Sequence, residues 1–400
     1  MEGQLVFQSK RLQRFEQLIF SELASYKQKK LEEGKNMIDL SIGSPDQPPP
    51  AFIQQAIIEG IQQPYAFQYT LTGFPTFNEA VSSFYERKYQ VKVDPNTEVL
   101  QTMGSQDALM HLPLAFVDEG DIVLLPDPGY TAYDAAIKIA GATIYPMPLL
   151  EENQFLPDLT AIPTHIAQKA KMMILNFPGN PVPALAPRDF FKQVVEFAKK
   201  YQIMVVHDFA YSELVFDGEN AVSFLSVEGS KDIGIECNSL SKSFNMAGSR
   251  VGYVIGNKDI ISYFRKLKSN LDYGVFAPVQ HAATVALLNG DDFLIENKKV
   301  YEERRDILVS GLNEIGWNVS KPKATMFVWA KIPKGIKSTD FVYQLMDEAG
   351  VIMTPGIAFG KHGEGYVRIA LVQPVERIRE AVKRIKDSRV IQKVKDNIIM

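Results

Sequence analysis

The chain has 400 residues and 46% hydrophobic content, enough to bury the core of one large domain and of a smaller one. The net charge of −4 argues against a nucleic-acid-binding protein, because such proteins normally carry a basic face. Cys237 is the only cysteine, which excludes an intrachain disulfide and favours a reducing compartment. No apolar run has the length of a membrane span, and the N-terminus has no signal-peptide pattern. We therefore expect a globular cytoplasmic protein with neither nucleic acid nor a membrane as a partner.

The first part of the chain predicts two helices, a short strand and an aromatic loop. Residues 9–34 place apolar side chains at a helical period, and a second helix is expected at about 51–60. Between them, IDLSIGSPDQPPP indicates a strand that ends at Gly43 before a proline-rich bend. Residues 64–77 are aromatic and rich in turn residues. They fit either a functional loop or interface, or a loop packed on the surface.

From residue 97 the sequence alternates between short apolar strands and helices. EVLQTMGSQDAL predicts a strand, a turn at Gly104 and a helix that runs to about Phe116. Other helices are expected up to about 140 and at 188–201. Further strands are expected at 121–125, 143–147 and 171–175, before Asp208, before Lys242, and in RVGYVIG. This alternation predicts the α/β class, with a mostly parallel sheet of seven strands flanked by helices on both faces.

The last hundred residues predict a smaller α+β domain. Residues 292–316 indicate one long charged helix, and MFVWAKI and YVRIALV indicate strands beside helices at about 338–349 and 374–387. We therefore expect a large domain at 46–290 and a small domain made of 1–45 and 291–400. GIAFGKH looks like a phosphate loop, but only three residues separate its glycines and no Ser or Thr follows its lysine, which excludes a nucleotide P-loop.

The stretch SLSKSFNMAGSR at 239–250 carries the strongest chemical signal. It sets Lys242 among small hydroxyl residues and apolar runs, with Arg250 eight residues later. A lysine amine held away from water has a lowered pKa and can attack a carbonyl to form a Schiff base. The small neighbours leave room for a flat ring, and an arginine suits a phosphate dianion. Taken alone, the segment fits a surface lysine better, so its companions along the chain decide.

Polar residues follow several predicted strands, and ligands of parallel sheets bind at these carboxyl ends. Asp208 could keep the ring nitrogen of an aldehyde cofactor protonated, or it could be a helix-capping or salt-bridging residue. Arg368 could hold the carboxylate of an α-amino acid through two parallel hydrogen bonds. No metal site is expected. The other candidates are Gly104, Ser105 and Gln106 at a helix start, Ser239, Ser241 and Arg250 for a phosphate, Tyr130 for the ring face, and Tyr211 and Asn180 for the phenolic oxygen.

Together these motifs resemble class I pyridoxal-phosphate-dependent aminotransferases of fold type I. NFPGNP, HDFAY and SLSKSFNMAGSR, with their spacings, carry the resemblance, which extends from IGSPD to GYVR. It implies pyridoxal 5′-phosphate bound by the large domain, with Lys242 as Schiff-base residue and proton shuttle. It implies that Asp208 holds the pyridine nitrogen, that Asn180 and Tyr211 hold the phenolic oxygen, and that the phosphate contacts come from Ser105, Gln106, Ser239 and Arg250. It also implies a homodimer in which Tyr69 serves the neighbouring site, and a substrate site that includes Gly43, Asn180 and Arg368.

The expected reaction is transamination between an α-amino acid and a 2-oxo acid. Residues 269–280 and 322–333 look most like the alanine-forming and LL-diaminopimelate branch. Because 269–280 carries only Asp272 as a charge, we expect alanine or another neutral amino acid, with glutamate as a donor and 2-oxoglutarate or pyruvate as acceptor. LL-diaminopimelate or aspartate aminotransferase is the alternative, and a β-lyase on the same scaffold is the second. The intact lysine, aspartate and arginine set disfavours a non-catalytic binding protein.

Two departures from the family pattern affect the shell around the cofactor. Residues 180–184 read NPVPA, where the family usually has NPTG or NPTA, and Ser249 stands where tryptophan is frequent. Neither departure removes a catalytic group, but both weaken inference about the substrate.

Overall fold

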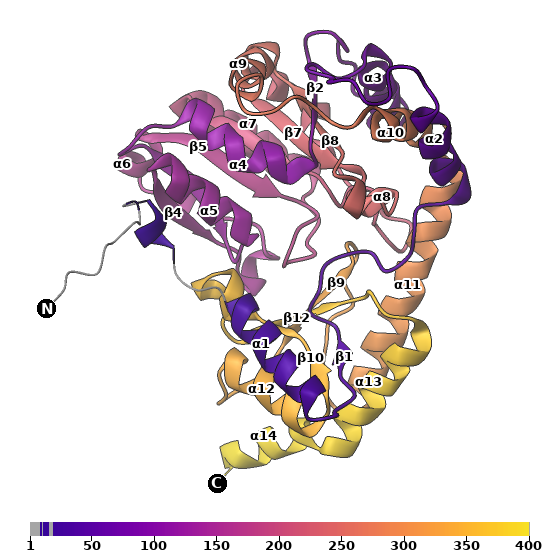
Figure 1. Cartoon of the computed structure of the whole chain (residues 1–400). Helices are drawn as coiled ribbons and strands as arrows, with labels where there is room; N and C mark the ends of the chain where they lie inside the picture. Colours follow the sequence, from indigo (N-terminus) through magenta and orange to yellow (C-terminus); the bar gives the residue numbers. More distant parts are fainter. Residues whose placement is uncertain (1–8, 10, 16–18, 400) are drawn as a thin grey trace, which may run out of the picture.

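The larger part of the molecule is built on a seven-stranded sheet (Figure 1). The computed structural model describes residues 9, 11–15 and 19–399, and only the backbone of 395–399. The strands lie in the order β2-β8-β7-β6-β5-β3-β4, and all neighbours are parallel except β8, which is antiparallel to β2 and β7. The predicted α/β class and mostly parallel sheet are confirmed. The strands are β2 (Val99–Thr102), β3 (Ile122–Asp127), β4 (Thr143–Pro148), β5 (Ala170–Asn176), β6 (Met204–Asp208), β7 (Gly234–Ser239) and β8 (Gly252–Gly256).

Helices cover both faces of this sheet, which explains why most of its strands are apolar on both sides. Phe191 and Ala283 lie in the core on one face, and Leu112 and Phe264 lie in the core on the other. The first face packs against α3 (Pro75–Tyr89), α7 (Arg188–Tyr201) and α10 (Ala277–Asn289), with α2 (Ala51–Ile61) against α10. The second face packs against α4 (Ser105–Phe116), α5 (Thr131–Ala140) and α9 (Lys258–Lys268).

A separate hydrophobic core holds the smaller part of the molecule together. It contains a three-stranded antiparallel sheet in the order β11-β12-β9 and a parallel pair of β1 with β10. The predicted strands MFVWAKI and YVRIALV coincide with β9 and β12. The elements are α1 (Ile19–Glu32), β1 (Ile38–Asp39), β9 (Phe327–Lys331), α12 (Ser338–Glu348), β10 (Val351–Ile352), β11 (Thr354–Pro355), β12 (Tyr366–Ala370), α13 (Val375–Ser388) and α14 (Val390–Ile399).

The long helix α11 (Asp291–Glu314) connects the two cores and runs along one side of both parts in Figure 1. Leu294 near its start is buried in a core of the seven-stranded sheet, and Leu308 and Leu312 are buried in the second core. The helix predicted at 292–316 is confirmed. The division of the chain at 46 and 291 stays a prediction, since α11 contributes side chains to both cores.

Three expectations about local structure need correction. The helix predicted over 9–34 is shorter, because a 3-10 turn at Leu12–Arg14 ends in extended backbone at Phe15 and α1 begins only at Ile19. Residues 10 and 16–18 of that range lie outside the described part. The loop expected at 64–77 ends at α3, whose first residue is proline, a residue suited to the first helical turn. Helices α3, α9, α10 and α14 have no counterpart in the prediction. Within the described residues no helix combines the length and apolar character that a membrane crossing requires.

Candidate active site

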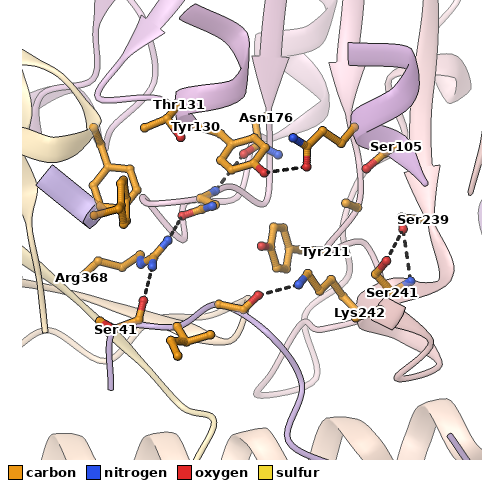
Figure 2. Close-up of a pocket in the computed structure, with 18 of the residues that line it drawn as sticks. Ser41, Ser105, Tyr130, Thr131, Asn176, Tyr211, Ser239, Ser241, Lys242 and Arg368 are labelled. Carbon is orange, nitrogen blue, oxygen red and sulfur yellow. Dashed lines mark hydrogen bonds between the residues drawn. The ribbon is translucent and has the colours of Figure 1, made fainter. Parts of the chain in front are cut away.

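A cavity of about 600 Å³ lies where the parallel strands end, with walls from both cores. Strands β5, β6 and β7 end at Asn176, Asp208 and Ser239, which line it, and Arg368 on β12 lines it from the smaller part. Figure 2 shows Asn176, Ser239 and Arg368 around one space, with Lys242 and Tyr211 between them. The predicted residues on its wall are Gly43, Ser105, Gln106, Tyr130, Asn180, Asp208, Tyr211, Ser239, Ser241, Lys242, Arg250 and Arg368.

Lys242 enters the cavity from the short helix α8 (Leu240–Ser243), which follows β7 directly. Ser239 caps this helix, since its Oγ accepts from the backbone amide of Ser241 at 3.2 Å. Lys242 Nζ donates to the carbonyl oxygen of Gly43 at 2.6 Å. Burial, together with the positive charges of nearby arginines, lowers the pKa of Lys242 to about 8. An appreciable fraction of this amine is therefore neutral near pH 7, as a nucleophile or base requires.

Asp208 is a buried carboxylate at the end of β6. Its Oδ2 accepts from the Tyr133 hydroxyl at 2.6 Å, and its Oδ1 accepts from the Ala210 amide at 3.2 Å. Burial raises the pKa of Asp208, although these two donors oppose the shift. Among the described residues no cation lies within ion-pair distance of it. A buried carboxylate in this setting is stabilised by a cationic ligand group.

Hydroxyl and amide donors gather at the N-terminus of α4. Ser105 and Gln106 form its first turn, and Ser239 Oγ donates to Ser241 Oγ at 2.9 Å on the neighbouring wall. The exposed Arg250 lies against the start of α4, where its Nη2 donates to the Met103 carbonyl at 3.4 Å. Gly104 makes this approach possible, because a Cβ there would lie 2.6 Å from Arg250 Nη2. Helix-start amides with hydroxyls and a guanidinium form an anion site.

Arg368 is buried between two aromatic rings, with its guanidinium carbon 4.4 Å from the Phe327 centroid and 4.8 Å from that of Phe359. Nη1 donates to Asn180 Oδ1 at 2.8 Å, and Nη2 donates to the Ser41 carbonyl at 2.5 Å. Burial lowers the pKa of Arg368 to about 10. Its buried Nε has no hydrogen-bond partner in the described part of the chain. A carboxylate ligand would supply both the missing acceptor and the missing charge.

Three polar residues complete the wall. The Tyr130 hydroxyl donates to Gln106 Oε1 at 3.2 Å, and the backbone amide of Asn180 donates to Asn176 Oδ1 at 2.8 Å. Tyr211 packs edge-on against Phe327 with a centroid distance of 5.7 Å. Burial raises the pKa values of Tyr130 and Tyr211, so both phenols stay protonated and can donate hydrogen bonds.

Of the predicted residues, Gly104 and Tyr69 do not line this cavity: Gly104 adjoins its wall as the residue before α4, whereas Tyr69 lies apart from it. Its side chain is 80% exposed and packs against Tyr273 with a centroid distance of 4.9 Å. Tyr65, Phe67 and Leu71 of the same segment are also exposed, and so is Phe276, whose ring packs against Phe67 with a centroid distance of 5.7 Å. Within one chain, Tyr69 therefore does not contribute to the site.

Some residues in and behind the cavity wall have no counterpart in the sequence prediction. Tyr133 contacts Asp208, and Asn176 Nδ2 donates to the backbone carbonyl of Asp208 at 2.8 Å. Asn176 is a polar residue at the end of an apolar strand, the same signal that singles out Asp208. Tyr133 lies three residues after Tyr130, so the helical period places both on one face of α5. Ser41, Lys27 and Asp39 also line the cavity and have no such signal.

Residues 35–385 match the family model for aminotransferase class I and II, so the chain belongs to this family. It is 46% identical over 364 residues to an LL-diaminopimelate aminotransferase of Moorella thermoacetica, covering 91% of this chain and 93% of the relative. It is 43% identical over 383 residues to an LL-diaminopimelate aminotransferase of Aquifex aeolicus, covering 96% and 99%. The substrate-bound BacF structure from Bacillus subtilis superposes with a TM-score of 0.92 at 37% identity, covering 96% and 98%.

The expected class, aminotransferase with pyridoxal 5′-phosphate, is confirmed. The residues of the cavity fit this cofactor. An anion site at α4 suits its phosphate, the unpaired carboxylate of Asp208 suits its ring nitrogen, and the amine of Lys242 suits its aldehyde. When bound, the cofactor supplies the electron sink that makes the α-proton of an amino acid removable.

Proposed function

We propose that the predicted residues divide the cofactor and the substrate between them as follows. Lys242 carries the cofactor aldehyde, and Asp208 faces the ring nitrogen. Ser105, Gln106, Ser239, Ser241 and Arg250 hold the phosphate, with Gly104 giving Arg250 its approach. Tyr130 covers one ring face, and Asn180 and Tyr211 donate to the phenolic oxygen. Gly43, Asn180 and Arg368 form the substrate site.

Lys242 acts as the acid–base group of the reaction. Its Nζ would take the proton from the substrate α-carbon and would then, as the conjugate acid, give that proton back, so one positioned base would perform both transfers. A pKa lowered to about 8 suits this role, because the neutral amine accepts a proton and its conjugate acid readily gives it back. Arg368 fixes the α-carboxylate, which limits rotation of the substrate while the proton moves.

We infer that the amino donor is LL-diaminopimelate and that a 2-oxo acid such as 2-oxoglutarate accepts the amino group. The relatives that are 41–46% identical over nine tenths of the chain bear that name, which supports the alternative over alanine. The observation that carries the amino-acid site itself is the buried Arg368, whose Nε lacks a partner in the described residues. Exchange between alanine and glutamate stays a prediction. A β-lyase remains the second alternative.

A homodimer in the cytoplasm is part of the same proposal. The exposed aromatic surface around Tyr69 suits a second copy of the chain, because an aromatic patch without cover is costly in water. Tyr69 would then reach the phosphate site of the neighbouring subunit. The single cysteine, Cys237, is a buried free thiol, which fits a reducing compartment.

A substrate panel on the purified holoenzyme tests the proposal. Each amino acid is offered with 2-oxoglutarate, and glutamate formation is measured. We expect LL-diaminopimelate to have the highest kcat/KM, ahead of alanine and aspartate by at least about tenfold, or about 1.4 kcal/mol. A higher value for alanine would return the assignment to a neutral donor. Release of pyruvate and ammonia from a β-substituted amino acid, without exchange of oxo acids, would indicate the lyase.

A further inference from the structure

One face of α1 forms a wall of the active-site cavity. Phe20, Leu23, Ala24 and Lys27 all line it, and the spacing i, i+3, i+4, i+7 places them in one row along the helix. Three of the four are apolar, and the row ends on a cation. This row therefore matches a ligand with a methylene chain followed by a charged end.

The end of β1 and the residues that follow it also line this cavity, and Asp39, the last residue of β1, is the anion that pairs with this cation. Asp39 Oδ2 accepts from Lys27 Nζ at 2.7 Å, while Asp39 Oδ1 accepts from the amide and the hydroxyl of Ser41 at 2.9 and 2.6 Å. The Asp39 side chain is 12% exposed and that of Lys27 is 33% exposed. An ion pair at a cavity wall, with one open side, can exchange contacts with a bound ligand.

The pair lies close to the proposed carboxylate site. Arg368 Nη2 donates to the Ser41 carbonyl, and two residues of chain from Ser41 back to Asp39 span at most about 7 Å. The two carboxylate carbons of diaminopimelate are six bonds apart, and bonds of about 1.5 Å separate them by up to about 8 Å. A diaminopimelate molecule whose α-carboxylate lies at Arg368 is thus long enough to bring its far end to Lys27 and Asp39.

Both members of the pair retain capacity for further hydrogen bonds. A lysine ammonium has three donors, and only the one toward Asp39 is used among the described residues. An ionised carboxylate has about four acceptor positions, of which Asp39 uses three. The distal end of diaminopimelate carries one carboxylate and one ammonium on the same carbon, which complements this arrangement charge for charge.

We propose that Lys27 binds the distal carboxylate and Asp39 the distal ammonium of diaminopimelate, with Phe20, Leu23 and Ala24 along its methylene chain. This inference rests on the proposed function, because it takes diaminopimelate as the substrate. Two charged contacts and the chain fix three substituents of the distal carbon. The pair therefore also selects the configuration of that carbon, and hence the LL isomer over the meso isomer.

Four substrates separate the two contacts without any mutation. LL-diaminopimelate has both distal groups, 2-aminopimelate lacks the ammonium, L-lysine lacks the carboxylate, and L-norleucine lacks both. We expect kcat/KM to fall at least about tenfold for each missing charged group, the size of a charge-assisted hydrogen bond. If norleucine is used as well as LL-diaminopimelate, no charged distal subsite exists and the proposal is overturned.

Variants then assign the contacts to residues. Asp39→Asn should lower the preference for LL-diaminopimelate over 2-aminopimelate about tenfold, and Lys27→Met should lower its preference over L-lysine by a similar factor. Both should bring the ratio of LL to meso isomer close to one. Lys27→Arg keeps the charge and should keep the substrate ratios, and it is the variant to measure if Lys27→Met does not fold.

Lys30→Met is the matched control. Lys30 also lies on α1, and its Nζ pairs with Asp347 of α12 at 2.6 Å, but it does not line the cavity. It should lower thermal stability as much as Lys27→Met while leaving the substrate ratios unchanged. If Lys27→Met and Asp39→Asn slow all four substrates equally, the ion pair only stabilises the packing of α1 against β1. The inference then fails, while the proposed function stands. If the wild-type enzyme uses alanine but no diaminopimelate, the proposed substrate fails and the subsite with it.

Discussion

The Tyr133 hydroxyl is the strongest contact of Asp208 in the structure, so Tyr133→Phe is the most direct test of the ring-nitrogen site. The substitution removes one buried donor, the bond of 2.6 Å to Asp208 Oδ2, and leaves only the Ala210 amide on this carboxylate. The ring of Tyr133 is fully buried and would keep its packing as phenylalanine. The effect should therefore come from the hydroxyl alone.

The size of the effect follows from the charge on the acceptor. A hydrogen bond to an ionised group contributes about 1.5–3 kcal/mol, or about tenfold to a hundredfold in an equilibrium constant. The Tyr133 bond lowers the pKa of Asp208 against the desolvation that raises it, so its loss raises that pKa further. The ionised carboxylate then becomes harder to keep, and it pairs less well with the cationic ring nitrogen.

Two measurements check this prediction. The dissociation constant of pyridoxal 5′-phosphate, from titration of the cofactor-free protein, should rise at least about tenfold, and kcat/KM should fall by a similar factor. The acidic limb of the pH–rate profile should move to higher pH, because the group needed in its ionised form now binds a proton more readily. Tyr301→Phe is the control, since Tyr301 is equally buried and its hydroxyl has no hydrogen bond within the described residues. An effect below threefold in Tyr133→Phe, with an unmoved pH profile, would refute the reasoning.

Four further predictions concern the lysine, the arginine and the aromatic surface. Lys242→Ala should abolish both turnover and the visible absorption of the bound cofactor, and retention of both would show that another residue carries the aldehyde. In the cofactor-free protein, modification of Lys242 by an amine reagent, followed by mass spectrometry, should increase through a pH of about 8, well below the range of exposed lysines; a midpoint near 10 would contradict its lowered pKa. Arg368→Lys should raise KM for every amino acid by at least about tenfold, because an ammonium cannot reproduce the two parallel hydrogen bonds of the guanidinium; a change confined to one substrate would place Arg368 at the side-chain subsite instead. Mixed dimers of Tyr69→Ala and Lys242→Ala chains should regain activity, since one of their two sites is complete, and no recovery after verified subunit exchange would argue against a shared site.

The large sheet and the core of the site could be predicted from the sequence because both depend on local signals. Most strands of the large sheet are short and rich in apolar residues, Asp208 is the last residue of β6, and Lys242 lies three residues after the end of β7. The carboxyl ends of parallel strands meet at one edge, so the residues that follow them come together without knowledge of the strand order. Arg368 could be predicted from its chemistry, because a guanidinium on the strand YVRIALV suits a substrate carboxylate.

The second wall of the cavity could not be predicted in the same way. Lys27 and Asp39 lie on different elements and belong to no recognisable motif. They meet only because α1 and β1 pack on the same core. Lys27 stands in a run of lysines that fits a solvated helix end, which is the correct description of its neighbour Lys29. A contact between two such residues depends on tertiary packing, and a local period contains no information about it.

Helix α11 gives the molecule a particular kind of cooperativity. Its 24 residues extend about 36 Å, and side chains from its two halves are buried in different cores. Loss of either core would leave half of this helix without its packing, and an isolated half of about twelve residues is only marginally stable in water. A ligand in the cavity contacts residues of both parts of the molecule, so its binding stabilises the same two parts that α11 joins. The two parts of the molecule are therefore expected to fold as one unit.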